Sequence, residues 1–285
     1  DRDCYNWGYD PYHYTAPEGS YASDAADGAT RIREFRQMVQ ALHKAGLRVG
    51  MDVVYNHTTA SGQKPRSVLD RIVPGYYHRL DKQGRVETST CCDNTATENL
   101  MMEKLMIDSV VTWASQYHID SFRFDLMGHQ PRPAMERLRS ALRKAVGREI
   151  PLIGEGWNFG EVADGRRFVQ ASQLSLPGSG IGTFSDRTRD AVRGGGPADS
   201  GAELVSRQGF INGLSYDRNA AAPTDLRHDE LLKAADLVRV GLAGTMRDFQ
   251  MENHAGRVVP LSAIDYAGQP AGYVAEPAEV VNYVE

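Results

Sequence analysis

The chain has 285 residues, of which 41% are hydrophobic and 24% are charged, as in an ordinary globular protein of one or two domains. Its formal net charge is -5, and it has no dense run of Lys and Arg, so nothing favours a nucleic-acid or anionic-membrane partner. No apolar run is long enough to cross a bilayer, and no signal-peptide pattern opens the chain.

The first part of the chain predicts a loop, a helix and a strand. Residues 1–29 are rich in Tyr, Asp, Pro and Gly, as loops are. Apolar side chains then recur at spacings of three and four over Ile32–Leu42, and Gly46 ends this helical pattern. The apolar stretch Leu47–Tyr55 has the length of a strand that is buried on both faces.

The same order repeats twice. A helix is predicted over 98–116 and a strand over Ile119–Leu126; a second helix is predicted over 133–146 and a strand over Ile150–Ile153. Three helix-then-strand units in a row indicate an α/β fold with a parallel sheet.

The signal weakens after these units. Residues 158–228 read as long loops with short elements, followed by a helix over Glu230–Leu242 and a strand over Val280–Val284. The triplet Gly194–Gly196 has no strand before it and no clear helix after it, so a turn is favoured over a phosphate-binding loop.

Polar residues stand at the carboxyl end of each predicted strand. Asn56 and His57 end the first, Arg123 and Asp125 end the second, and Glu155 follows the third. (β/α)8 barrels and doubly wound sheets both place their sites at such ends, so this pattern leaves both folds open.

A pair of carboxylates suits glycoside hydrolysis, in which one group protonates the leaving oxygen and the other attacks the sugar or activates water. Strand alternation puts Arg123 and Asp125 on one face, where the guanidinium favours the ionised nucleophile. Glu155 stands near Trp157, and an apolar indole is expected to raise a carboxyl pKa, as an acid catalyst requires. A structural ion pair or a solvated acid is the alternative reading.

At these residues the sequence resembles the α-amylase family of glycoside hydrolases. Three segments, Asp52–His57, Ser121–Asp125 and Gly154–Trp157, are similar to three motifs of that family in the same order. Any one alone is a weak signal, whereas three ordered motifs make a strong one.

The subgroup resemblance is to pullulanases and plant limit dextrinases. Tyr5–Pro11, Leu126–His129 and the segment Ser89–Glu98 are similar to their signatures. The resemblance covers essentially the whole chain. It implies one incomplete catalytic domain over residues 1–285, a partial (β/α)8 barrel with about five of its eight strands, the first, second and eighth being absent.

The resemblance also implies a role for each matching residue. Asp125 is the expected nucleophile, Glu155 the acid and then the base, and Arg123 the cation that keeps Asp125 charged. His57 is expected to hydrogen-bond the reacting sugar and Tyr9 to stack on it. The remaining expected substrate-binding residues support or border this site: Trp7, Asp52, Asn56, Met127, His129 and Trp157. The expected partner is an α-glucan such as pullulan, amylopectin or a limit dextrin, cleaved with retention of configuration.

The fourth family motif, a His-Asp pair after a strand like Val280–Val284, does not occur before the chain ends at Glu285. With the missing strands, this predicts a fragment of a larger enzyme that is inactive alone. Two alternatives stay open: an α-1,4-acting amylase or transglycosidase of the same family, and a non-catalytic glucan-binding protein.

Metal and redox chemistry receive little support from the sequence. The mechanism requires no cofactor, and although relatives often carry structural calcium, no acidic loop here specifies it. No Cys/His spacing suggests zinc. Cys91 and Cys92 are adjacent and are expected not to bridge each other, while a pairing of Cys4 with either stays open. The resemblance to bacterial pullulanases favours an extracellular or envelope setting.

Overall fold

The computed structural model describes residues 7–196, 199–223 and 228–284. Backbone contacts divide the chain into two compact units, Asp1–Ser175 and Leu176–Glu285, and each is described by itself. The predicted helices and strands are present, and the strands are shorter than the apolar runs from which they were predicted. Cys4 and the first two residues of the Tyr5–Pro11 segment lie outside the described residues.

The first unit is built on three parallel strands. They are β1 (Gly50–Val53), β4 (Ser121–Phe124) and β5 (Leu152–Gly154), in the order β1-β4-β5. Their register sets Asp52 opposite Arg123, and Phe124 opposite Gly154. The carboxyl ends of the three strands therefore come together, which is what the sequence pattern required.

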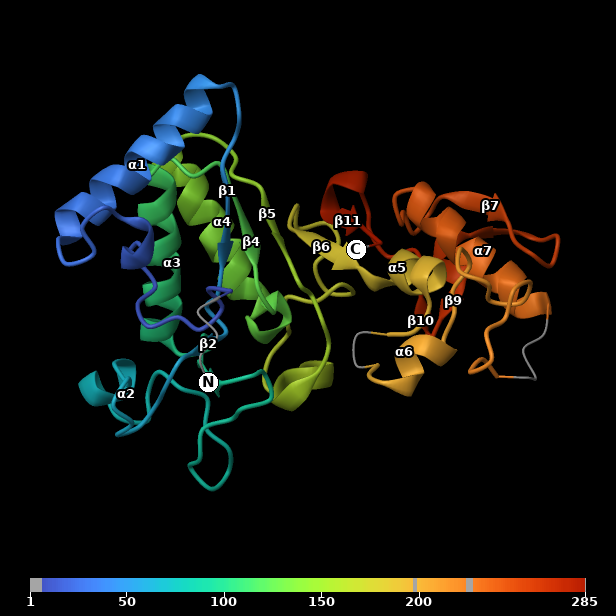
Figure 1. Ribbon diagram of the computed structural model, residues 1–285, viewed down its shortest axis with the longest axis horizontal. Helices are drawn as coiled ribbons and strands as arrows, with labels where there is room; N and C mark the ends of the chain where they lie inside the picture. The colour runs from blue at the N-terminus through green and yellow to red at the C-terminus, as the bar shows by residue number, and fades with distance from the viewer. Residues whose placement is uncertain (1–6, 197–198, 224–227, 285) are drawn as a thin grey trace. The chain divides into compact units, whose positions relative to one another are not determined.

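Three long helices accompany these strands (Figure 1): α1 (Gly28–Lys44), α3 (Leu100–Gln116) and α4 (Arg132–Val146). The Asp27 carboxylate caps α1 by accepting from the backbone N–H groups of Ala29 and Thr30. Helix α4 begins after Pro131 and ends at Gly147, whose φ of 76° gives the left-handed cap that glycine favours.

The core of the first unit lies between the strands and the helices. Phe122 and Phe124 of β4 are fully buried, while the alternate residue Arg123 is left to the other face of the strand. Helices α3 and α4 supply the apolar partners Met102, Met106, Val110, Trp113, Met135, Leu138 and Leu142. This packing fixes the direction in which Arg123 points.

Short elements connect the long ones. The two-residue strands β2 (His57–Thr58) and β3 (Asp93–Asn94) pair antiparallel, with His57 opposite Asn94. The others are η1 (Gly19–Tyr21), α2 (Leu69–Ile72), η2 (Met127–His129) and η3 (Gly160–Gly165).

The second unit contains one parallel strand pair, β6 (Gly182–Ser185) with β11 (Val280–Asn282). Its helices are α5 (Asp186–Arg193), α6 (Ala202–Ser206) and α7 (His228–Leu242), with η4 (Leu261–Ala263) and η5 (Pro277–Glu279). Two small hairpins pair β7 (Gln250–Glu252) with β8 (Val258–Pro260), and β9 (Asp265–Tyr266) with β10 (Gln269–Pro270). Val240, Met251, Leu261, Ile264 and Ala271 form its apolar core.

The α/β class with parallel strands is thus confirmed. Three strands with parallel partners lie in the first unit and two in the second, within the described part of the chain. No helix among the described residues is long and apolar enough to cross a membrane.

Candidate active site

Four charged side chains meet at the carboxyl ends of β1, β4 and β5. The Arg123 guanidinium lies 2.9 Å from Asp52 Oδ1, 3.2 Å from Asp125 Oδ1 and 2.9 Å from Glu155 Oε1. Arg123, Asp125 and Glu155 are partly buried and Asp52 is exposed, so a ligand can reach all four. Two carboxylates suited to acid and nucleophile chemistry are thereby held by one cation.

Asp125 is fixed from two sides. Its backbone N–H donates to Val53 O at 2.9 Å, which continues the β1–β4 pairing by one residue. The Asn56 side-chain amide donates to the Asp125 carboxylate at 2.9 Å and to its backbone oxygen at 3.0 Å. Asn56 is buried, so these bonds hold Asp125 in one orientation.

The residue after Asp125 adopts an uncommon conformation. Leu126 has φ 41° and ψ 48°, the left-handed region that a branched side chain rarely visits. This turn aims its N–H at Glu155 Oε2, 2.9 Å away. Backbone of this kind persists at functional sites where the surroundings enforce it.

Glu155 has the properties of an acid catalyst. Burial raises the pKa of its carboxyl, and this effect outweighs the hydrogen bond from Leu126 and the charge of Arg123, which both lower it. The expectation that Trp157 raises this pKa is wrong, because Trp157 hydrogen-bonds the carboxyl and lowers its pKa. The raised pKa comes mainly from burial, and the negative charge of Asp125 adds to it.

His57 and Tyr9 lie beside the carboxylates. The Tyr9 hydroxyl donates to Asp52 Oδ2 at 2.5 Å, and the Arg123 guanidinium lies 5.7 Å from the centre of the Tyr9 ring. His57 is 2% exposed, with Nδ1 2.6 Å from Asn56 Oδ1 and Nε2 2.7 Å from Tyr9 O. The structure therefore brings Tyr9, Asp52, Asn56, His57, Arg123 and Glu155 together around Asp125. Trp7, on the loop that carries Tyr9, is 75% exposed.

Met127 and His129 differ from the expectation. Both side chains are buried, His129 being 1% exposed, so they do not face a ligand in this structure. Burial also lowers the pKa of His129 to about 4, which keeps the imidazole neutral. Trp157 is half-buried and remains accessible.

A buried polar network that the sequence did not indicate supports His129. Arg79 is 1% exposed, and its guanidinium pairs with Glu98 at 2.9 Å and with Glu161 at 2.8 Å while donating to His129 O at 3.1 Å. Ser89 contacts both Glu161 and His129 Nε2. Glu161 lies in a stretch read as loop, and no local pattern distinguishes it from a surface acid.

Cys91 and Cys92 form a disulfide. The expectation that these neighbours do not bridge is wrong here. The pair follows Ser89 and precedes β3, which pairs with His57, so the Cys91 sulfur comes to 3.6 Å from His57 Nε2. The sequence did not indicate that this disulfide lies beside His57, because its position depends on the pairing of β2 with β3.

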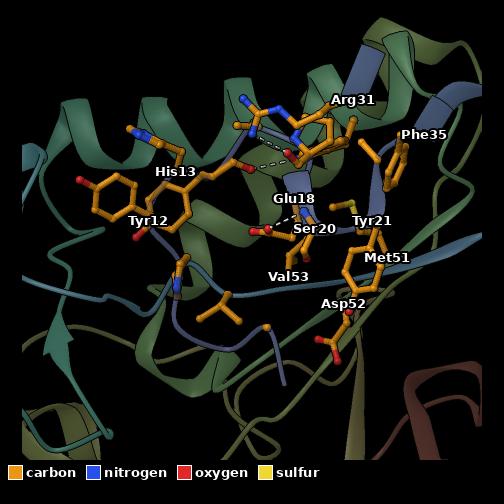
Figure 2. Close-up of a pocket in the computed structure, with 18 of the residues that line it drawn as sticks. Tyr12, His13, Glu18, Ser20, Tyr21, Arg31, Phe35, Met51, Asp52 and Val53 are labelled. Atoms are coloured by element: carbon orange, nitrogen blue, oxygen red, sulfur yellow. Dashed lines mark hydrogen bonds between the residues drawn. The ribbon is translucent and has the colours of Figure 1, made fainter. Parts of the chain in front are cut away.

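A pocket of about 620 Å³ lies between the N-terminal loop, α1 and β1 (Figure 2). Tyr12, Glu18 and Tyr21 of the N-terminal loop line it together with Phe35 of α1 and Met51 of β1. Of the charged cluster, Asp52 lines this pocket, whereas Arg123, Asp125 and Glu155 are not among its lining residues. The carboxylate pair is thus outside it.

Comparison with known proteins reveals close relatives. The pullulanase of Klebsiella pneumoniae is 51% identical over 289 residues, which is 99% of this chain and 26% of the relative. Pullulanase 1 of Arabidopsis thaliana chloroplasts is 46% identical over 293 residues, covering 99% of this chain and 30% of the relative. No protein-family model matches the chain.

Solved structures agree with these relatives. The crystal structure of PulA from Klebsiella oxytoca matches 98% of this chain and 26% of its own with a TM-score of 0.92 and 50% identity. Klebsiella pneumoniae pullulanase complexed with maltotriose matches 98% of this chain and 26% of its own, also at 0.92, with 49% identity. The chain is therefore an α/β protein homologous to glycoside hydrolases.

Within that class it is a homologue of the pullulanases along 99% of its length. It spans about a quarter of the length of the Klebsiella relatives.

Proposed function

We propose that this chain carries catalytic residues of an enzyme that hydrolyses α-1,6-glucosidic links in pullulan, amylopectin or limit dextrins. The observation that carries the proposal is the position of Asp125 and Glu155, which are bridged by Arg123 at the ends of neighbouring parallel strands. The names of the relatives supply the substrate class.

In this mechanism Asp125 is the nucleophile. Arg123 and Asn56 donate to its carboxylate, and these hydrogen bonds orient it for attack. Attack on the anomeric carbon gives a β-glucosyl enzyme and releases the other half of the glucan after protonation of the leaving oxygen.

Glu155 protonates the leaving oxygen in the first step and takes a proton from water in the second. Its raised pKa supports the first role. Retention of configuration follows from two displacements and requires carboxyl groups about 5–5.5 Å apart. The chemistry uses two carboxylates and water, so we expect no cofactor, and removal of metal ions by a chelator should leave the rate unchanged.

Substrate binding is assigned to the side chains around this pair. Tyr9 is proposed to stack on the reacting sugar, and Trp7 and Trp157 to border it, since each is at least partly accessible. His57, Asp52 and Asn56 are proposed to bind the sugar or to hold its contacts. The buried Met127 and His129 are assigned a supporting role.

The finer fold proposal is a partial (β/α)8 barrel over residues 1–285, lacking its first, second and eighth strands. Three parallel strands, β1, β4 and β5, that each follow a helix and have charged residues at their carboxyl ends support it. The likeness to pullulanase structures is consistent with it.

Product analysis tests the function. The protein is incubated with pullulan and, separately, with amylose; the 285-residue chain is used, and any longer natural protein that contains it. For the longer protein, maltotriose from pullulan with amylose untouched is the expected result, and Asp125→Asn should abolish it, whereas the 285-residue chain alone is expected to give no product. Cleavage of amylose alone would indicate an α-1,4-acting relative. Glucan affinity without any product would indicate a binding protein.

A further inference from the structure

Three potential metal ligands from distant parts of the sequence meet beside the carboxylate cluster. One ligand atom each from His57, Cys91 and Cys92 lies within 4.8 Å of the other two. His57 is buried, Cys92 is half-buried and Cys91 is exposed, so the sulfurs are accessible from solvent and the imidazole lies in the protein interior. The two sulfurs are joined as a disulfide in this structure.

We propose that reduction of the Cys91–Cys92 disulfide creates a binding site for a thiophilic divalent cation such as Zn²⁺ or Cd²⁺, held by the two thiolates and His57. Occupation of the site withdraws His57 and blocks the sugar site. The binding claim stands by itself, whereas the blocking claim rests on the proposed function.

The geometry suits such an ion. Zinc binds cysteine sulfur at about 2.3 Å and histidine nitrogen at about 2.0–2.1 Å in a tetrahedral arrangement, so sulfur and nitrogen on one ion lie about 3.6 Å apart. Cys91 Sγ is 3.6 Å from His57 Nε2. The fourth position is left for water, as in sites with three protein ligands.

The surroundings favour a cation. The carboxylates of Asp125, Asp10 and Asp93 all act on His57 with negative charge. Lys64 pairs with Asp93 at 2.7 Å and offsets the charge of that carboxylate.

The chemistry balances with a small dithiol as reductant. The dithiol supplies two electrons and two protons, its own sulfurs form a disulfide, and the Cys91–Cys92 bond opens to two thiols. Binding of the cation then releases these two protons to solvent. No further oxidant or reductant is needed.

Binding also changes the sugar site. His57 Nε2 lies 2.7 Å from Tyr9 O, and a cation on that nitrogen replaces this contact. Tyr9 and His57 are the residues assigned to the reacting sugar. Metal occupancy therefore removes one proposed sugar contact and releases the loop that carries the other.

The test measures cadmium uptake, because thiolate-to-cadmium charge transfer gives an ultraviolet band that does not depend on activity. A Cys4→Ser background assigns every thiolate signal to Cys91 and Cys92. The protein is reduced with a small dithiol, desalted without oxygen and titrated with Cd²⁺, beside an oxidised sample. The 285-residue chain is used, together with any longer natural protein that contains it.

The expected result is one Cd²⁺ per chain after reduction and none at this site before it. Cys91→Ser, Cys92→Ser and His57→Gln should each weaken binding at least about 10-fold. The exposed His13→Gln is the matched control and should leave binding unchanged. Circular dichroism of each variant verifies that it is folded, and the exposed position of Cys91 makes Cys91→Ser the variant least able to disturb folding.

Two outcomes would overturn the proposal: equal uptake by reduced and oxidised protein, or unchanged affinity in folded His57→Gln. Inhibition is measured separately on pullulan. Loss of cleavage when Cd²⁺ is added to reduced but not to oxidised protein supports the blocking step. Full cleavage with the site filled contradicts it. A protein that binds Cd²⁺ as expected but cleaves nothing in any state contradicts the proposed function and leaves the metal site standing.

Discussion

Arg123 shows how a single side chain organises the site. Its guanidinium is in contact with Asp52, Asp125 and Glu155, one from each of the three neighbouring strands. The planar group presents several N–H donors in fixed directions, so it can hold three carboxylates where a lysine cannot. Exchange of Arg123 for Lys is therefore expected to disturb all three partners together.

The acid role of Glu155 predicts a pH dependence. Burial raises its pKa, and the first step requires the protonated carboxyl, so kcat/KM should fall as the pH rises through that raised pKa. Glu155→Gln should lower kcat about 100-fold or more and should remove this fall of kcat/KM with rising pH. The control is Glu136→Gln, which changes an exposed acid on α4. It should leave kcat and the pH dependence of kcat/KM unchanged. If kcat/KM of Glu155→Gln still fell as the pH rises, the acid would be another group.

The raised pKa of Glu155 should also make the free energy of unfolding depend on pH. A carboxyl whose folded pKa lies above its unfolded value releases its proton first in the unfolded chain, so its contribution is present at low pH and is lost as the pH rises through the folded pKa. Chemical unfolding of the protein and of Glu155→Gln across this range should converge at low pH and diverge above it. Parallel curves would show that burial does not act on Glu155 in this way.

Residue-level prediction from the sequence succeeded where local order decides the position. Asp52, Asn56, Arg123, Asp125 and Glu155 stand near the carboxyl ends of strands, and the parallel order of these strands is enough to place them together. Met127 and His129 were expected to border the substrate because the segment Leu126–His129 resembles that of the pullulanases. Both side chains are instead buried, after a left-handed turn at Leu126. A leucine gives no sequence signal for such a turn.

At the scale of elements, η2 packs closely on the segment after β5. A Cβ on Gly128 would lie 2.1 Å from Trp157 O, a backbone atom that cannot move aside cheaply. Gly128→Ala should lower the free energy of unfolding by about 2 kcal/mol. Gly28→Ala, in the first turn of α1 with open space around it, should raise it by about 0.5 kcal/mol. Urea unfolding of both variants is the measurement, and equal effects would contradict the packing argument.

The Arg79 network joins the segment before β3 to η2 and η3. Burial opposes ionisation of Glu161, but hydrogen bonds from Ser89, Arg79 and Asn94 prevail and bring its pKa to about 2. Arg79→Leu leaves two carboxylates without their cation and should cost about 3 kcal/mol of stability.

Arg85→Leu is the matched control for this substitution, because Arg85 is exposed and pairs with Asp81 on the surface. It should cost less than about 1 kcal/mol. The difference is measured from urea midpoints above pH 5, where Glu161 is ionised in both the folded and the unfolded chain. A similar cost for the two variants would show that burial of Arg79 carries no energetic weight.

Element prediction failed where patterns were short. The four residues of β6 and the eight of α5 lie in a Gly-, Ser- and Arg-rich region, and α5 buries Arg187 and Arg189 in place of apolar side chains. A helix that packs through arginine stems and ion pairs has no apolar period to find. The longer helices α1, α3, α4 and α7 each had such a period and were predicted.

At the scale of the whole molecule, the chain matches about a quarter of the length of Klebsiella pullulanases with the same backbone course. The parallel order of strands and the position of charged groups at their carboxyl ends follow from sequence, because each unit repeats a helix and a strand. The position of the Cys91–Cys92 disulfide beside His57 did not, since it depends on pairing between β2 and β3, which are separated by the 34 residues 59–92.

The central claim is that Asp125 forms a covalent bond with the sugar, and trapping that bond tests it most directly. In Glu155→Gln, α-maltotriosyl fluoride can still react because fluoride leaves without protonation, whereas the second step lacks its base. Mass spectrometry should therefore find one maltotriosyl group on the peptide that carries Asp125. An adduct on another residue, or none while the fluoride is consumed, would contradict the assignment.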